Sequence, residues 1–500
     1  MKTYETLSPS DVDFFRKIAS STFLNPFSLS REAADRAAVG DDAEGEGSLL
    51  PVLLETLADR VGRLDTGPRP LLERYRGNDR AMLRLGVAFL VFHRYAEAFD
   101  RYIAEQRSHR DELLPCPFAG ELFHALLGYG FDRADAVQSV AFFFQLRRAF
   151  HFISSALLGS SSLMRRTREA LWQAVFTCDT RRYLETFWCR MEDFSVLLLG
   201  ETGTGKGAAA WAIGNSGFIP FLPERGGFKE SFMNAFIPVN LSEYSESLIE
   251  SELFGHRKGA FTGAIENHAG VFSRCNPCGA IFLDEIGEVS ESVQIKLLNV
   301  LQQRLFSPVG GHGSERFEGR IIAATHQNLV ERRKEGRFRD DFYYRLSSCA
   351  ISMPTLRERL AEAPDELEVL LGNVLRRMTD AENPEMAETV LTVIRRDLPD
   401  DYPWPGNVRE LEQAVRSVLL TGHYFGDCPV MRPAPPVSGD MPEDGETAAL
   451  FERFRRGDVT LEELQSGYAS YLFKRFGSYG EVSRRLGVDW RTAKKFCRKA

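Results

Sequence analysis

The sequence predicts a protein of several domains: a mainly α-helical domain over residues 1–150, an α/β nucleotide-binding domain over 151–427 and an all-α helix-turn-helix domain over 448–500. Over 81–106 and 135–153, apolar residues recur every three or four positions, as in amphipathic helices. Between 155 and 425, short apolar strands alternate with helical stretches, which is typical of a parallel sheet. Residues 428–447 are rich in proline, glycine and acids and are interpreted as a flexible linker.

Composition and charge exclude several classes of protein. The chain has 500 residues, more than a single hydrophobic core usually holds. Its formal net charge is −8, so any nucleic-acid contact must come from a local basic patch. Eight scattered cysteines are too few for a disulfide scaffold, and the apolar runs are too short to span a bilayer. We expect a soluble, cytoplasmic protein with no membrane contact and no N-terminal signal segment.

A glycine-rich loop follows the apolar stretch 194–199 and leads into a helical segment. The glycines let backbone N–H groups turn toward a phosphate, and the start of the helix adds its positive end. A lysine at the end of the loop can then reach the terminal phosphates. The usual pattern continues with a serine or threonine that binds magnesium, whereas this chain has a glycine there. The candidate ATP-binding residues of the loop are Gly200, Glu201, Thr202, Gly203, Thr204, Gly205, Lys206 and Gly207.

Two further strands end in polar residues that suit phosphate chemistry. The apolar run 279–283 ends at Asp284 and Glu285. Asp284 suits a magnesium-bound water, and Glu285 is placed to polarise an attacking water as the general base. The run 320–324 ends at Thr325 and His326, which could sense the γ-phosphate. The expected cofactors are therefore ATP and Mg²⁺, with Asp284 as the candidate metal ligand.

Three arginines complete the candidate nucleotide site. Arg339 and Arg345 lie in "GRFRDDFYYRL". A guanidinium can stabilise the charge that builds up when a phosphoanhydride is hydrolysed, and such a group often comes from a neighbouring subunit. Ordinary surface salt bridges remain an alternative for these two residues. Arg409 stands at a helix start after a proline-rich turn and is also interpreted as facing phosphate.

The segment 255–264, "GHRKGAFTGA", has neither strand alternation nor helical periodicity. It sets one aromatic residue, Phe261, on a loop with glycines at 255, 259 and 263. An exposed aromatic ring is typical of a contact that is buried only on a partner.

Over residues 155–425 the chain resembles the bacterial enhancer-binding proteins, the AAA+ activators of sigma-54 RNA polymerase. The motifs that carry the resemblance are "LLGSSSLMR", "GETGTGK", "ESELFGHRKGAFTGA", "FLDEIGE", "IIAATH", "GRFRDDFYYRL", "LRER" and "WPGNVREL". The resemblance implies an α/β AAA+ P-loop ATPase domain with a helical lid, which assembles into a hexameric ring.

The resemblance also implies roles for single residues. Lys206 and its loop bind ATP, and Asp284 and Glu285 act with magnesium and water. Asn240 resembles the asparagine that holds the catalytic glutamate until a partner is contacted. Arg339 and Arg345 act on the ATP of the adjacent subunit, and Arg409 reads the nucleotide state. Phe261 and Thr262 press on sigma-54 and move it during ATP turnover.

The C-terminal segment 476–500 is basic, with only Glu481 and Asp489 as acids, and reads as helix, "LGV" turn, helix. It resembles the Fis-type helix-turn-helix that ends most of these activators. On that model residues 490–498 lie in a major groove of double-stranded DNA. The candidate DNA contacts are Arg491, Lys494 and Lys495.

The chain departs from the family pattern in three places. Gly207 stands where the family usually has glutamate, the segment 214–240 is longer than usual, and Cys275 and Cys278 lie in the turn before the acidic strand. The lone CxxC is interpreted as a turn without zinc. Residues 1–150 show no phosphoacceptor pattern and are interpreted as a helical regulatory domain.

Two other functions stay open from the sequence. The chain could be a DNA-binding regulator whose motor is inactive, or an ATPase that remodels a protein other than sigma-54.

Overall fold

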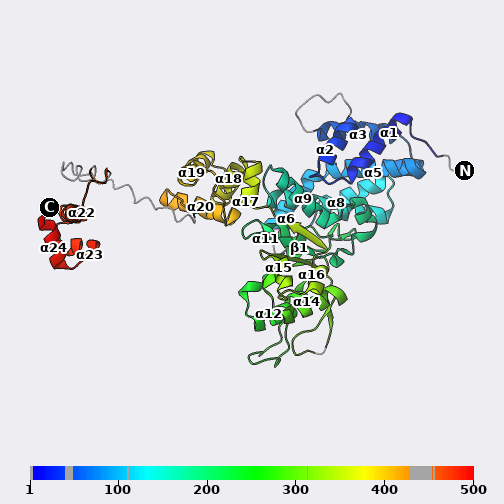
Figure 1. Cartoon of the computed structure of the whole chain (residues 1–500). Coiled ribbons are helices and arrows are strands. Elements are labelled where there is room, and N and C mark those ends of the chain that lie inside the picture. Colours follow the sequence, from blue (N-terminus) through cyan, green and yellow to red (C-terminus); the bar gives the residue numbers. More distant parts are fainter. Residues whose placement is uncertain are drawn as a thin grey trace. The chain divides into compact units, whose positions relative to one another are not determined.

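The computed structural model describes residues 4–39, 49–109, 112–311, 313–426, 453 and 456–499. The chain divides into two compact units, Met1–Tyr424 and Phe425–Ala500, each of which is taken by itself (Figure 1). The linker expected over 428–447 lies outside the described residues. None of the described helices combines the length and the apolar character that a membrane crossing requires.

The N-terminal part of the first unit is helical, as predicted. Side-chain caps begin several of these helices, for example Ser8 before α1 and Asp132 before α8. The helix α8 continues without a break past residue 150, the expected domain boundary. The helices are α1 Pro9–Thr22, α2 Leu29–Val39, α3 Leu50–Leu64, α4 Leu71–Arg74, α5 Gly77–Arg94, α6 Ala96–Ser108, α7 Ala119–Gly128, α8 Arg133–Ala156, α9 Ser162–Phe176 and α10 Thr180–Arg182.

A five-stranded parallel sheet forms the centre of the unit, in the order β4-β5-β8-β1-β9. Its strands are β1 Val196–Leu199, β4 Phe236–Asn240, β5 Ala280–Asp284, β8 Arg320–Thr325 and β9 Cys349–Ser352. Side chains alternate between the two faces, so Leu198 and Leu197 enter different hydrophobic cores. This confirms the α/β prediction with a parallel sheet.

Helices and short elements surround the sheet. One face packs with α8, α9 and α11, and the other with α12, α14 and α16. The helices are α11 Lys206–Gly214, α12 Glu246–Phe254, α13 Val271–Arg274, α14 Glu291–Gln303, α15 Leu329–Lys334 and α16 Asp340–Leu346. The short elements are η1 Tyr183–Phe187, η2 Met191–Asp193, β2 Phe221–Leu222, β3 Gly227–Phe228, η3 Phe232–Asn234, η4 Leu241–Glu243, η5 Ile286–Glu288, β6 Leu305–Phe306 and β7 Glu315–Arg316.

The segment that is longer than usual, 214–240, forms the hairpin β2–β3 against the N-terminal helices. The ring of Phe228 stacks on that of Phe144 in α8, with 4.0 Å between the centroids. Phe221 contacts Phe123 of α7 at 5.7 Å. The N-terminal helices and the nucleotide-binding domain therefore share one continuous hydrophobic core.

A four-helix subdomain ends the first unit, around a core of its own that includes Leu371, Ile394 and Leu411. Its helices are α17 Leu356–Glu362, α18 Glu366–Thr379, α19 Pro384–Asp397 and α20 Asn407–Thr421. This subdomain is the expected helical lid.

The second unit contains α22 Leu461–Phe476, α23 Tyr479–Leu486 and α24 Trp490–Lys499. Thr460 and Glu463 form a capping box before α22, and Gly477 and Gly487 end α22 and α23 with positive φ. The helices α23 and α24 flank the "LGV" turn, in the order that the sequence predicts. Their assignment to the helix-turn-helix class stays a prediction.

Candidate nucleotide-binding site

The phosphate loop connects β1 to α11 at the carboxyl end of the sheet. Gly203 and Gly205 have φ of 81° and 95°, a region that glycine adopts without strain. Lys206 is 7% exposed, and its Nζ donates hydrogen bonds to the carbonyl oxygens of Gly200 and Glu201 at 2.8 and 3.0 Å. Burial lowers the pKa of Lys206, whereas the charges of Glu285 and Asp284 oppose that shift. The ammonium group is thus held over the loop where a phosphate would enter.

The two acids at the end of β5 adopt different environments. Asp284 is half-buried, and desolvation, followed by the charge of Glu285, raises its pKa. Glu285 has φ of 56°, a conformation that is uncommon for a residue with a side chain and is typical of functional sites. The Nδ1 atom of His326 lies 2.8 Å from Oε2 of Glu285. The neighbouring strand β8 thereby positions this carboxylate.

The structure brings Asn240 to this edge but not to Glu285. Asn240 pairs with Asp284 in the register of β4 and β5. Its Nδ2 donates to Glu243 at 2.9 Å, and its Oδ1 caps η4 by accepting from the backbone N–H of Ser242. The side-chain amide of Asn240 is therefore hydrogen-bonded within its own turn. Among the described residues, the hydrogen-bonding partner of the Glu285 carboxylate is His326.

A cavity of about 370 Å³ opens between the phosphate loop, the acids and the lid. Leu157 and Leu158, just after α8, line one side, while Arg376, Arg377 and Arg409 line the lid side. The sequence predicted Arg409 but not Arg376 and Arg377. These two lie in an ordinary amphipathic helix, where a basic pair reads as a solvated face.

The helical lid forms hydrogen bonds to the phosphate loop that the sequence did not predict. Asn407 has φ of 53°, and its Nδ2 donates to the Thr202 carbonyl oxygen at 3.0 Å. The backbone N–H of Val408 donates to the carbonyl oxygen of Gly203 at 3.1 Å. A Cβ on Gly203 would lie 2.2 Å from the Gly406 carbonyl oxygen, so only glycine fits there.

A salt bridge also joins the helical lid to the phosphate loop. Arg357 of α17 donates to both carboxylate oxygens of Glu201, and this hydrogen bonding lowers the pKa of Glu201. The sequence does show the "LRER" motif that contains Arg357. The spacing of residues, however, does not identify Glu201 as the partner of this arginine.

The two candidate trans-acting arginines lie apart from the cavity. Arg339 pairs with Glu291 at 2.9 Å and with Asp341 at 2.9 Å, and hydrogen bonding to Asp341 and then Glu291 raises its pKa. Arg345 is exposed and donates from Nε to the Leu301 carbonyl oxygen at 3.2 Å. Neither lines the nucleotide cavity of its own chain.

The loop 255–264 is anchored at its base to two other segments of the chain. Its base forms β-bridges from His256 to His268 and to Val309. At Gly259 and Gly263, φ is 83° and 105°, and the added Cβ atoms would meet nothing within 4 Å, so the backbone conformation alone requires glycine there. Phe261 is 40% exposed, with its ring 4.9 Å from that of His256.

A family model described as "Sigma-54 interaction domain" matches residues 182–352. This match includes the phosphate loop, both acids and the loop that carries Phe261. Residues 182–352 therefore form a domain of the sigma-54 interaction type.

Relatives that align with this chain include proteins named as regulatory proteins. Transcriptional regulatory protein ZraR of Salmonella typhimurium is 37% identical over 304 residues, which cover 60% of this chain and 62% of that protein. The Nif-specific regulatory protein of Azotobacter vinelandii is 38% identical over 272 residues, which cover 54% of this chain and 48% of that protein. The chain thus covers less than two thirds of the length of either relative. NtrX from Brucella abortus, a solved structure, has a TM-score of 0.41 and 22% identity, and the alignment covers 76% of this chain and 79% of that chain.

The CxxC of the sigma-54 interaction domain lies in the turn before β5. Burial raises the pKa of Cys275 to about 12 and that of Cys278 to about 11. Both side chains are thus neutral thiols at neutral pH and poor nucleophiles. The arrangement agrees with a turn rather than with a reactive pair.

The candidate DNA contacts lie outside the sigma-54 interaction domain, on α24. Arg491 and Lys495 are exposed. Lys494 lies over the ring of Trp490, with Nζ 4.9 Å from the centroid, and Trp490 is itself 50% exposed. The helix therefore presents a basic face with an aromatic residue at its start.

Proposed function

We propose that this protein is an ATP-driven activator of sigma-54 RNA polymerase that binds double-stranded DNA upstream of promoters and works as a homo-oligomeric ring, expected to be a hexamer. The observation that carries the proposal is a loop with exposed Phe261 and Thr262, built on the same domain as the phosphate loop and the acids of β5. Such a protein would act in the cytoplasm, together with the polymerase and the promoter.

The donor groups at the nucleotide cavity fit ATP with Mg²⁺. Residues 200–207 would hold the phosphates, with Lys206 at the terminal ones. The carboxylate of Asp284 is the hard oxygen ligand that Mg²⁺ prefers, although position 207 offers no hydroxyl. Mg²⁺, when bound, would neutralise charge on the phosphates. Arg409 at the start of α20 would sense the nucleotide from the lid.

Hydrolysis on this proposal depends on the release of Glu285. Its carboxylate would accept the proton of the attacking water, a role that needs a carboxylate free of other partners. His326 now holds it at 2.8 Å, and Thr325 and His326 lie at the strand end where the γ-phosphate would arrive. We infer that nucleotide loosens this contact. Asn240 would take its place as a partner of Glu285 only after its bond to Glu243 is broken.

The transition state would be completed by a second copy of the chain. Arg339 and Arg345 do not line the nucleotide cavity of their own chain, so they would reach the ATP of the adjacent subunit. The ion pairs of Arg339 with Glu291 and Asp341 are exposed, so replacing them by contacts with a phosphate would cost little free energy.

A concentration series on the full chain tests the motor. ATP turnover should rise steeply with protein concentration, and Arg339→Ala should lower it by roughly 10³-fold. Arg337→Ala is the matched control, because Arg337 is also exposed and paired, with Glu335 at 3.5 Å. Turnover that is independent of concentration would contradict the ring.

The partner is tested separately with a transition-state nucleotide analogue. The full chain should then bind sigma-54, and Phe261→Ala should abolish binding while turnover persists. DNA binding should be lost on replacing Arg491, Lys494 and Lys495 with alanine.

Two alternatives give different results in these experiments. A chain that binds DNA without any turnover would be a regulator with an inactive motor, and Gly207 would be the first residue to examine. Turnover without any sigma-54 contact would indicate remodelling of another protein.

A further inference from the structure

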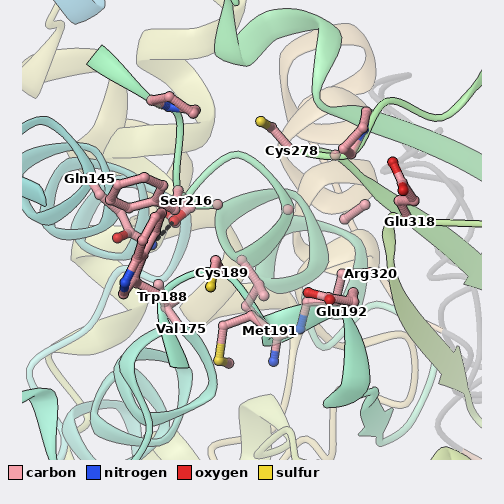
Figure 2. Close-up of a pocket in the computed structure, with 18 of the residues that line it drawn as sticks. Gln145, Val175, Trp188, Cys189, Met191, Glu192, Ser216, Cys278, Glu318 and Arg320 are labelled. Atoms are coloured by element: carbon pink, nitrogen blue, oxygen red, sulfur yellow. Dashed lines mark hydrogen bonds between the residues drawn. The ribbon is translucent and has the colours of Figure 1, made fainter. Parts of the chain in front are cut away.

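A second cavity, of about 270 Å³, lies at the opposite end of the P-loop helix from Lys206. Its wall includes Gln145 of α8, the segment after η1, the end of α11 and the turn that carries Cys278. Figure 2 shows Trp188 and Cys189 across the space from Cys278 and Glu318, with Met191, Glu192 and Arg320 drawn along the lower side. None of the residues that line the nucleotide cavity lines this one.

The body of the cavity is apolar. Trp188 and Phe218 lie with their ring centroids 4.6 Å apart, and both line the space with Met191, Val175 and Ile213. Aromatic and thioether groups of this kind give a ligand contact area without strict directional demands. The volume of the cavity, about 270 Å³, is slightly below the roughly 300–1,000 Å³ that is usual for pockets that bind organic ligands, so only a small ligand would fit.

Two cations border this apolar space. Arg320 donates from Nε to the Phe194 carbonyl oxygen at 2.8 Å and from Nη2 to that of Ala174 at 2.7 Å. Within the described part of the chain, its Nη1 has no hydrogen-bond partner and the side chain has no ion pair. Burial lowers the pKa of Arg320 to about 10, so the guanidinium is charged at neutral pH. Lys229 of the β2–β3 region is the second cation.

Two carboxylates, Glu318 and Glu192, also line the cavity, but within the described part of the chain neither forms an ion pair with Arg320. Glu318 is exposed and lies 3.6 Å from Arg316. The charge of Glu192 acts on Arg304. Arg320 therefore keeps a charge that no carboxylate of the described chain offsets. An apolar space beside an unpaired guanidinium suits an anion with an apolar body.

The cavity also borders elements whose other ends lie at the nucleotide site. Gln145 donates to the carbonyl oxygen of Ser216, just after α11, at 3.0 Å. The strands β5 and β8 begin at Ala280 and Arg320, which line this cavity, and end at the acids and at Thr325 beside the nucleotide cavity. A ligand here would contact the base of the helix and of both strands.

We propose that this cavity binds a small organic anion with an apolar body and serves as an effector site at the base of the P-loop helix. The effector role rests on the proposed ATPase function, whereas binding does not. The ligand class follows from the apolar walls and from the unpaired guanidinium.

Fluorescence of anilinonaphthalene sulfonate, an aromatic organic anion, tests binding to the full chain. The probe should bind the wild type, and Cys189→Phe, which fills the mouth of the cavity, should abolish binding. Cys178→Phe is the matched control, because Cys178 is also an exposed thiol but does not line the cavity. Lys229→Gln should weaken binding about two- to fivefold, as expected for a partly exposed charge.

Several results would overturn the binding site: no fluorescence change in the wild type, binding that Cys189→Phe leaves unaltered, or displacement of the probe by ADP. The effector role is measured by ATP turnover with and without the probe, in the wild type and in Cys189→Phe. Probe binding with unchanged turnover would refute that role. A chain without any turnover would instead contradict the proposed motor and leave the binding result intact.

Discussion

The N-terminal helices and the C-terminal helices differ in the hydrophobic core to which they belong. The N-terminal helices share a continuous core with the sheet, in which Phe144, Phe152 and Phe228 are all buried. The C-terminal unit has a small core of its own, built on Ala469, Leu472, Val482 and Ala493. The N-terminal helices are therefore packed as part of the central core, whereas the described C-terminal helices pack around a core of their own.

Polar contacts reinforce the N-terminal seam. Arg148 of α8 is fully buried and donates to the carbonyl oxygens of Asn215 and Gly217 at 2.7 and 2.6 Å, at the end of the P-loop helix. Its guanidinium also lies over the ring of Phe144, 4.4 Å from the centroid. A fragment that begins at residue 151 would cut α8 and remove these contacts, so the activity of the motor should be measured on the full chain.

The largest effect should follow from breaking the aromatic seam. Phe144 is 1% exposed and stacks on Phe228. Phe144→Ala should lower the free energy of unfolding of the first unit by about 3–5 kcal/mol, because the cavity would lie in a shared core. Thermal unfolding measures this loss, and Phe261→Ala, at an exposed ring, is the control. A variant that loses under about 1 kcal/mol would show that the two regions are not packed as one body.

The sequence predicted the placement of the candidate nucleotide-site residues better than it predicted this seam. Lys206, Asp284 and His326 each stand at the end of a strand or loop, so parallel topology brings them together whatever the details of packing. The seam joins residues far apart in sequence, and nothing local in Phe144 or Phe228 identifies the other as its partner. The domain boundary expected after residue 150 falls inside α8, which continues to Ala156.

Within the site itself, the contacts that the sequence did not predict are both local and non-local. Asn240 was expected to hold Glu285, whereas in this structure its side-chain amide donates to Glu243, three residues away, and that nearby carboxylate competes for the same amide. The lid residues Arg376 and Arg377 face the cavity only once the lid has packed.

Acid should weaken the N-terminal region through His93. Its ring lies 4.4 Å from that of Phe89, and burial, followed by the charges of Arg31 and Arg147, lowers its pKa to about 3. The unfolded chain takes up a proton near pH 6.5 and the folded chain does not, so stability is complete above that value and falls as the pH falls toward 3. Between pH 7 and 5 the loss should be about 1–2 kcal/mol.

The pH dependence of Tm checks this expectation. His93→Phe should flatten it, whereas His124→Gln, at an exposed histidine, should leave it as in the wild type. An unaltered slope in His93→Phe would exclude this histidine as the cause.

The C-terminal unit should respond separately. Val482 is fully buried in the small core, and Val482→Ala should destabilise that unit by about 1–2 kcal/mol. DNA binding should weaken while ATP turnover and the main unfolding transition remain unaltered. A lower Tm for the main transition would mean that the two units unfold together.

The smallest effect concerns Gly207, which lies in the first turn of α11. The other end of this helix packs against the N-terminal helices. A Cβ there would meet nothing within 4 Å, and φ is not positive, so a side chain costs no strain. Gly207→Ala should therefore raise stability by about 0.5–1 kcal/mol through helix propensity. Gly214→Ala, at the other end of α11, should do the reverse, because its Cβ would lie 2.3 Å from the ring of Phe236. Thermal unfolding distinguishes the two variants, and the gain should be seen in the main transition alone.

The same variant can be tested for ATP turnover. If Gly207→Ala also raised ATP turnover, the glycine would be limiting turnover by loosening the first turn of the P-loop helix. Unchanged turnover would show that the contacts of Lys206 fix that turn without help from position 207.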